Sequence, residues 1–186
     1  MDTLLKFAEG SRRLLERIAV GSMWLLMIMA AVTCFDVIAR KTGIPAPLTK
    51  LQELEWHFHA ALFSLWMGFS YTVNAHPRVD SFTEHLSFRR KAWIELIGCA
   101  FFALPYCALV AYHGLDFVAS SYKLAEQSDS TVGLRYRWAI KGIYVFGLWL
   151  VVLGIVSVGV RAFVFLFGNK TQEEVDLQVG HVELDV

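Results

Sequence analysis

Four long apolar stretches constrain the fold of this chain more than any other feature. They cover residues 18–35, 58–73, 92–111 and 139–167, and they contain nearly all of its aliphatic and aromatic side chains. A helix needs roughly 20 residues to cross the hydrocarbon core of a bilayer. With their connections, four such helices use up a chain of 186 residues. We therefore expect an all-α integral membrane protein with four tilted transmembrane helices plus short amphipathic interfacial helices.

The pattern divides the chain into a four-helix transmembrane domain, residues 1–168, and an acidic, flexible C-terminal tail, residues 169–186. We expect helices over 15–39, within 51–80, over 90–124 and over 136–167, and a short amphipathic segment at 81–91. Residues 1–17 fit equally an amphipathic segment on the membrane surface and the solvated start of the first helix. Pro105 falls inside the third helix and predicts a kink there.

The distribution of charged residues predicts how the chain is oriented in the membrane. The formal net charge is zero, which implies no attraction to nucleic acid. Lys and Arg are more numerous near the two termini and the second connection than on the opposite side. Since positive residues favour the cytoplasmic side, both termini are predicted to be cytoplasmic.

Small residues recur at helical spacing in two of the apolar stretches. Ala60, Ser64 and Gly68 are four residues apart, and Gly147 and Gly154 lie along the last stretch. Small side chains at this spacing let another membrane helix approach closely. They are candidates for a packing surface.

Charged residues at the span ends allow two interpretations each. Glu53 and Glu55 suit a helix N-terminus by their charge, or they pair with basic residues of a partner. Arg78 and Asp80 either fix the turn between the second and third helices or contact a partner. The basic residues that follow the polar loop are either solvated or bound to lipid headgroups, or they bridge that loop; they are Arg135, Arg137 and Lys141, with Glu126 and Asp129 opposite.

Two histidines raise a redox alternative. His57 and His113 are expected at similar depth on neighbouring helices, where two imidazoles could ligate a haem in a membrane anchor. The competing interpretation makes both interfacial polar residues, and we expect no cofactor. The middles of the four spans carry no charge, which argues against a self-contained proton-coupled exporter.

Several short motifs occur in a familiar order. They are Gly43-Ile44-Pro45, Glu53 with Glu55, Trp66-Met67-Gly68, His76-x-Arg78-Val79-Asp80, Glu126-x-Ser128, Tyr136-Arg137-Trp138-x-x-Lys141 and Gly147. Over residues 15–165 the chain resembles the small, DctQ-like membrane subunit of tripartite ATP-independent periplasmic (TRAP) transporters. Pro77 and Arg135 depart from the usual pattern, which has an aliphatic residue and a proline there.

The resemblance implies a non-catalytic scaffold subunit in a bacterial inner membrane. It would stabilise the static part of a large, elevator-type TRAP subunit that imports organic anions with sodium. A periplasmic substrate-binding protein and membrane lipids would be further partners. Our candidates for the partner interface are Glu53, Glu55, Ala60, Ser64, Gly68, Arg78, Asp80, Arg137, Trp138, Lys141, Gly147 and Gly154.

Overall fold

Long helices lying side by side make up the protein in the computed structural model, which describes residues 1–76, 83 and 85–179. The described part contains no strand. Its elements are α1 (Asp2–Thr42), α2 (Leu48–Thr72), α3 (Phe88–Ile97), the π-helix η2 (Gly98–Ala103), α4 (Leu104–Lys123), α5 (Arg137–Phe167) and α6 (Gln172–Val175).

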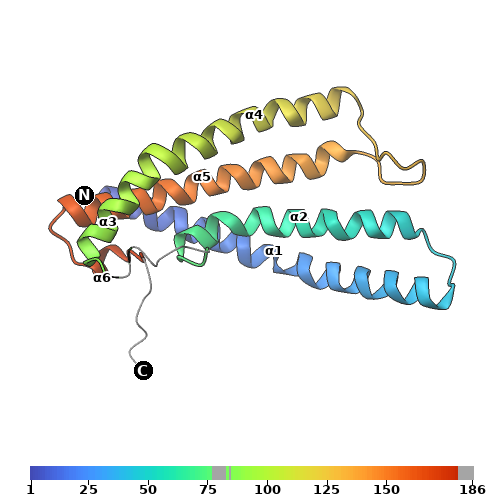
Figure 1. Ribbon diagram of the computed structural model, residues 1–186, viewed down its shortest axis with the longest axis horizontal. Helices are drawn as coiled ribbons and strands as arrows, with labels where there is room; N and C mark the ends of the chain where they lie inside the picture. Colours follow the sequence, from blue (N-terminus) through green and yellow to red (C-terminus); the bar gives the residue numbers. More distant parts are fainter. Residues whose placement is uncertain (77–82, 84, 180–186) are drawn as a thin grey trace.

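The helices form a row in which α5 lies between α4 and α2, and α1 lies on the far side of α2 (Figure 1). α1 also packs against α5 toward its N-terminus. The N-terminus, α3 and α6 gather at one end, which we call the terminal end. Residues 43–47 and 124–136 connect the helices at the opposite end, the loop end. This arrangement gives the chain two ends with different connections.

Three of the helical segments are long and apolar enough to cross a membrane: Asp2–Thr42, Phe88–Lys123 and Arg137–Phe167. The expected fourth span, α2, is absent from this set within the described residues. It begins with two carboxylates and two histidines, which lower its mean hydropathy. The all-helical prediction is thus confirmed, and three of the four spans meet the criterion of length and composition.

The first helix is longer than the sequence suggested. Residues 2–17 continue directly into the apolar stretch as part of α1, so they are the start of that helix. α1 ends at Gly43, whose φ of 71° is left-handed and whose N–H donates to Ala39 O over 3.0 Å. Glycine adopts this conformation without a steric penalty, which explains the sharp stop.

A local change of helix type precedes Pro105. The six residues of η2 are π-helical, and Pro105 follows within the first turn of α4. Proline lacks an N–H and cannot close a regular helical hydrogen bond, and π turns are one way in which a helix absorbs such an interruption. The helix path curves here, as expected from the sequence (Figure 1).

Candidate functional site

The small residues of α2 and α5 pack against each other inside the chain. A side-chain Cβ built on Gly68 would lie 2.5 Å from the carbonyl oxygen of Leu150, and one on Gly147 would lie 2.6 Å from Cβ of Ser64. One on Gly154 would lie 2.6 Å from the Gly68 carbonyl oxygen. These four predicted interface residues are buried, and Ala60 is partly buried. The stripe therefore joins α2 to α5 and is not available as a surface for another protein.

Glu53 is used within the chain at the loop end. Its carboxylate accepts a hydrogen bond from Ser128 Oγ and one from the Leu134 N–H, the latter over 2.5 Å. The Ser128 N–H in turn donates to Leu134 O over 3.0 Å, which closes the loop on itself. A Cβ at Gly133 would lie too close to the side chain of Ser128 and to the Glu53 carboxylate, so a side chain there would force both to move. The start of α2 thus holds the loop between α4 and α5.

Lys141 and Arg137 hold the same loop from the side of α5. Lys141 pairs with Glu126, and its Nζ lies 3.9 Å from the ring centroid of Phe117. Arg137 lies 3.5 Å from the Asp129 carboxylate and 4.0 Å from that of Glu126. The hydrogen bond from Lys141, together with its positive charge, holds the pKa of Glu126 below its usual range. Of the two interpretations, the structure supports the bridged loop.

These contacts form one unit, which we call the loop-end network. It consists of Glu53, Glu126, Ser128, Leu134, Arg137 and Lys141. Trp138 sits beside it, edge-on to Tyr122 with ring centroids 5.5 Å apart. Tyr136 takes a left-handed φ of 65° just before α5, and the next N–H donates to Glu126 O over 3.2 Å. Sequence motifs separated by up to 88 positions therefore meet at one place.

A second charged group at the loop end contains a carboxylate oxygen without a hydrogen-bond partner. Arg40 Nε donates to Asp36 Oδ2 over 2.6 Å, an ion pair between residues four apart on one helix. Asp36 is buried, yet its Oδ1 has no hydrogen-bond partner among the described residues. Oε1 of Glu55, on the adjacent helix α2, is likewise a buried atom without a hydrogen-bond partner among the described residues.

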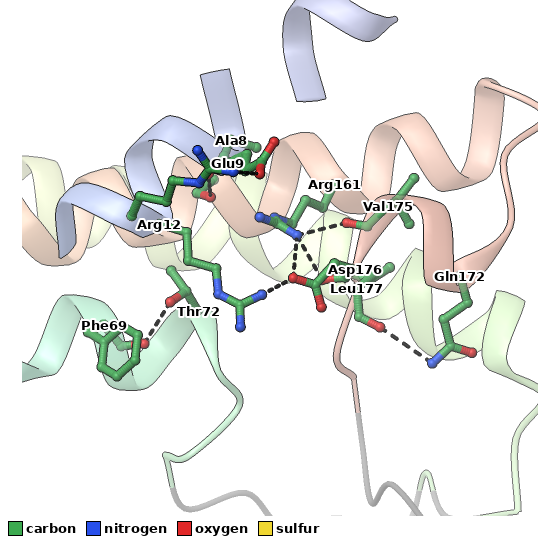
Figure 2. A network of polar contacts seen from close by, with 12 residues as sticks. Ala8, Glu9, Arg12, Phe69, Thr72, Arg161, Gln172, Val175, Asp176 and Leu177 are labelled. Atoms are coloured by element: carbon green, nitrogen blue, oxygen red, sulfur yellow. Dashed lines mark hydrogen bonds and ion pairs between the residues drawn. The ribbon is translucent and has the colours of Figure 1, made fainter. Parts of the chain in front are cut away.

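The terminal end carries a network that the sequence did not predict (Figure 2). Arg161 of α5, only 6% exposed, donates to the carbonyl oxygens of Val175 and Asp176 over 2.9 Å each. Its guanidinium also lies 3.1 Å from the Asp176 carboxylate, which pairs with Arg12 of α1 as well. We call Arg12, Arg161, Val175 and Asp176 the terminal-end network. It ties the segment after α5 to both α1 and α5.

Residues 169–179 are consequently folded against the helices. Val175 and Leu177 are buried, and Thr171 and Glu174 form a capping box at the start of α6. Lys170 also pairs with Asp2 at the N-terminus over 2.5 Å. The rest of the expected flexible tail, 180–186, lies outside the described residues. The signal for this fold was present in the sequence, because Thr-x-x-Glu before an apolar residue is a capping-box pattern.

The two histidines of the haem hypothesis are on helices that α5 separates. His57 Nδ1 faces the backbone carbonyl of Glu53, and its ring lies 4.1 Å from that of Trp56. His113 is exposed on α4, beyond α5 in the row (Figure 1). Within the described residues no group of three His, Cys, Asp or Glu could hold a metal ion. The geometry gives the haem alternative no support.

The predicted turn residues Arg78 and Asp80 lie outside the described residues.

A cavity of about 940 Å³ opens beside η2. At its wall the Tyr71 hydroxyl donates to Glu95 Oε1 over 2.9 Å and lies 3.2 Å from Cys99 Sγ. The remaining lining is largely aromatic and aliphatic, including Phe102 and Tyr106. This site joins α2 to the start of the third long helix.

Comparisons with known proteins agree with these observations. A comparison with curated proteins and one with solved structures found no significant match. A family model does match residues 29–175, and it describes the DctQ component of tripartite ATP-independent periplasmic transporters. That match includes the three motifs that meet in the loop-end network, which contain Glu53, Glu126-x-Ser128 and Tyr136-Arg137-Trp138-x-x-Lys141. Since it spans well over half of the chain, the protein belongs to the DctQ family, the small membrane subunits of TRAP transporters.

Proposed function

We propose that this chain is a rigid scaffold for the large membrane subunit of a TRAP transporter. The DctQ family is a transporter component and not an enzyme family. The large subunit would move an organic anion across the bacterial inner membrane by an elevator motion driven by sodium, after a periplasmic binding protein delivers it. The small subunit would stabilise the part that stays still.

The distribution of charge along the helices supports a passive role in the membrane. Residues 18–35, 96–115 and 142–160 contain no Asp, Glu, Lys or Arg. A charge at the bilayer centre costs about 2.5–3.5 kcal/mol on insertion scales, so a transport pathway that uses ionised groups usually reveals them at mid-depth. The charged networks of this chain lie toward the two helix ends.

We propose that α2 is the fourth span despite its polar start. It runs alongside α5 and packs against α1 and α5 (Figure 1). The small residues Ser64 and Gly68 face α5, and Trp66 Nε1 donates to Ser22 Oγ of α1 over 2.9 Å. A helix covered by neighbours on two sides tolerates more polar side chains than one surrounded by lipid.

Contacts at three levels along the helices are the observation that carries the scaffold proposal. The loop-end network ties α2 to the loop before α5, and the terminal-end network ties α1 to α5. Close backbone contact between α2 and α5 holds the middle. A body fixed at three levels resists the tilt that a moving neighbour would impose. The excess of Lys and Arg near the terminal end supports the proposal that both termini are cytoplasmic.

Reconstitution tests this proposal. The chain, its large subunit and its binding protein would be purified and placed in liposomes with a sodium gradient and a panel of radiolabelled organic anions. We expect uptake only when all three proteins are present, and no flux through this chain alone. Uptake by the large subunit and binding protein without this chain would refute the scaffold role.

A further inference from the structure

The cavity of about 940 Å³ beside η2 has walls from three separate parts of the chain. Tyr71 lies on α2, Gly98 begins η2, and Val179 belongs to the segment after α6. A Cβ built on Gly98 would meet nothing within 4 Å, so the missing side chain leaves this part of the cavity open. The volume falls in the range of about 300–1,000 Å³ that is usual for ligand sites. We call this space the η2 cavity.

The lining of the η2 cavity changes from polar to apolar along one face of the third long helix. Lys91 lines it in the first turn of α3, and Glu95 follows one turn later. Further along, the lining is aromatic and aliphatic, with Phe102, Tyr106 and Leu109. From Lys91 to Leu109 a helix rises by about 27 Å, more than the roughly 15 Å that one leaflet contributes to the hydrocarbon core. The cavity therefore has the length and the polarity of a lipid in one leaflet.

The polar end of the η2 cavity lies at the predicted membrane boundary. The third apolar stretch begins at residue 92, directly after Lys91. Trp93 is exposed two residues further on, and tryptophan is enriched at the level of the headgroups. Arg90, which is also exposed, precedes Lys91 in the same turn. Positive charge thus lies where a headgroup would be.

The acidic residue in the described lining is directed to groups of its own chain. Glu95, 8% exposed, accepts from the Tyr71 hydroxyl over 2.9 Å and from Cys99 Sγ over 3.7 Å. Its carboxylate is therefore engaged at the wall, one turn deeper than Lys91. The ammonium group of Lys91 is left to face a ligand at the mouth of the cavity.

We infer that the η2 cavity binds an anionic phospholipid, with the headgroup phosphate at Lys91 and an acyl chain along η2 and the start of α4. Acyl chains enter any space that opens to the hydrocarbon core, so a headgroup contact is what distinguishes a bound lipid from a passing one. Basic pockets between membrane helices bind anionic headgroups in this way. A zwitterionic headgroup fits less well, because its own cation repels the ammonium group. The site needs no contact with the large subunit, so it can be tested separately from the scaffold proposal.

Native mass spectrometry of the full chain, titrated with phosphatidylglycerol or phosphatidylcholine, tests this inference. The wild type should bind phosphatidylglycerol more tightly. Lys91→Gln should weaken that binding by about fivefold, the effect of removing one cation near a headgroup, and should change phosphatidylcholine binding little. Gly98→Leu should weaken the binding of both lipids by about tenfold or more, because the new side chain fills the open space. The melting temperature in detergent should stay unchanged in both variants.

Gly21→Leu and Lys41→Gln are the matched controls. A Cβ at Gly21 on α1 also meets nothing within 4 Å, and Lys41 is exposed at the loop end, so both variants should bind lipid as the wild type does. Equal affinity of the wild type for the two lipids, or of Lys91→Gln and wild type for phosphatidylglycerol, would overturn the inference. So would an equal loss in Gly98→Leu and Gly21→Leu. If Gly98→Leu kept its lipid but no longer bound the large subunit, the cavity would receive a protein side chain instead. Lys91→Gln decides alone if Gly98→Leu does not fold.

Discussion

The two ends of the helix row use charge in different ways. At the loop end, Glu53 and Glu126 accept from partners on a loop and at the start of α5, and several of these groups are partly exposed. At the terminal end, Arg161 is buried and receives its carboxylate from a segment that follows the helices. At the loop end the charged groups hold the loop 124–136 against α2 and α5. At the terminal end the carboxylate of Asp176 neutralises Arg161, which would otherwise be a buried cation without a counter-ion. A missing partner should therefore cost more at the terminal end.

Both ends depend on the contact between α2 and α5, so its disruption should have the largest effect. Gly147→Leu would drive a side chain into Ser64 and separate the helices. We expect a loss of more than about 3 kcal/mol of stability, the upper range for overpacking, seen as a lower melting temperature in detergent. Gly142→Leu on the same helix is the control, because a Cβ there meets nothing within 4 Å. Equal melting temperatures for both variants would contradict this packing.

The terminal-end network comes next. Asp176→Ala removes the carboxylate beside Arg161 and leaves that guanidinium with carbonyl partners only. We expect a loss of about 2 kcal/mol, together with faster tryptic cleavage after Lys170 as the segment detaches. Asp129→Ala is the counterpart at the loop end. Its carboxylate is 96% exposed, so its ion pair with Arg137 should contribute almost nothing. Similar losses for the two variants would remove the contrast between the ends.

Glu53→Gln tests the loop end itself. The amide keeps the shape of the side chain but weakens the bonds from Ser128 Oγ and the Leu134 N–H. Because Glu53 is partly exposed, we expect a loss of about 1 kcal/mol, smaller than for Asp176→Ala. A double-mutant cycle with Ser128→Ala should show coupling between the two side chains. Gln52→Ala, at an exposed neighbour on the same helix, is the control and should leave the stability unchanged. Additive effects of Glu53→Gln and Ser128→Ala would argue against the hydrogen bond between these side chains.

The same contrast explains which features could be predicted from sequence. Apolar stretches of spanning length identified every long helix, and the family motifs included most of the loop-end network, because Glu126, Arg137 and Lys141 lie close together in sequence. For these residues the sequence left a headgroup contact and a bridged loop open, and the structure supports the bridged loop. A small-residue stripe looks the same whether it packs against its own chain or another, so Ser64 and Gly68 were assigned to a partner surface. Only the three-dimensional arrangement decides between these uses.

The terminal-end network could not be predicted in this way. Arg12, Arg161 and Asp176 are far apart in sequence, and each alone resembles an ordinary residue at a membrane boundary. An acidic segment after the last helix is typical of a mobile tail. What overrides this tendency is the burial of Val175 and Leu177 together with the need of Arg161 for a carboxylate. Long-range pairing of this kind leaves no local pattern.

Acidification should loosen both ends by a small amount, through different carboxylates. The hydrogen bond from Lys141 lowers the pKa of Glu126 at the loop end, and the Thr171 N–H and then its hydroxyl lower that of Glu174 at the terminal end. A carboxyl whose pKa is lower in the folded state stabilises the fold above its unfolded pKa, and this contribution is lost as the pH falls through the folded value. The protection factors of the backbone amides of Ser128 and Val175, in which the intrinsic slowing of exchange in acid is divided out, should therefore fall below about pH 4, near the ordinary carboxyl range. Glu126→Gln should flatten the pH dependence at Ser128 alone, and Glu174→Gln that at Val175 alone. If either variant changed both amides equally, the two ends would act as one unit and their separate treatment would fail.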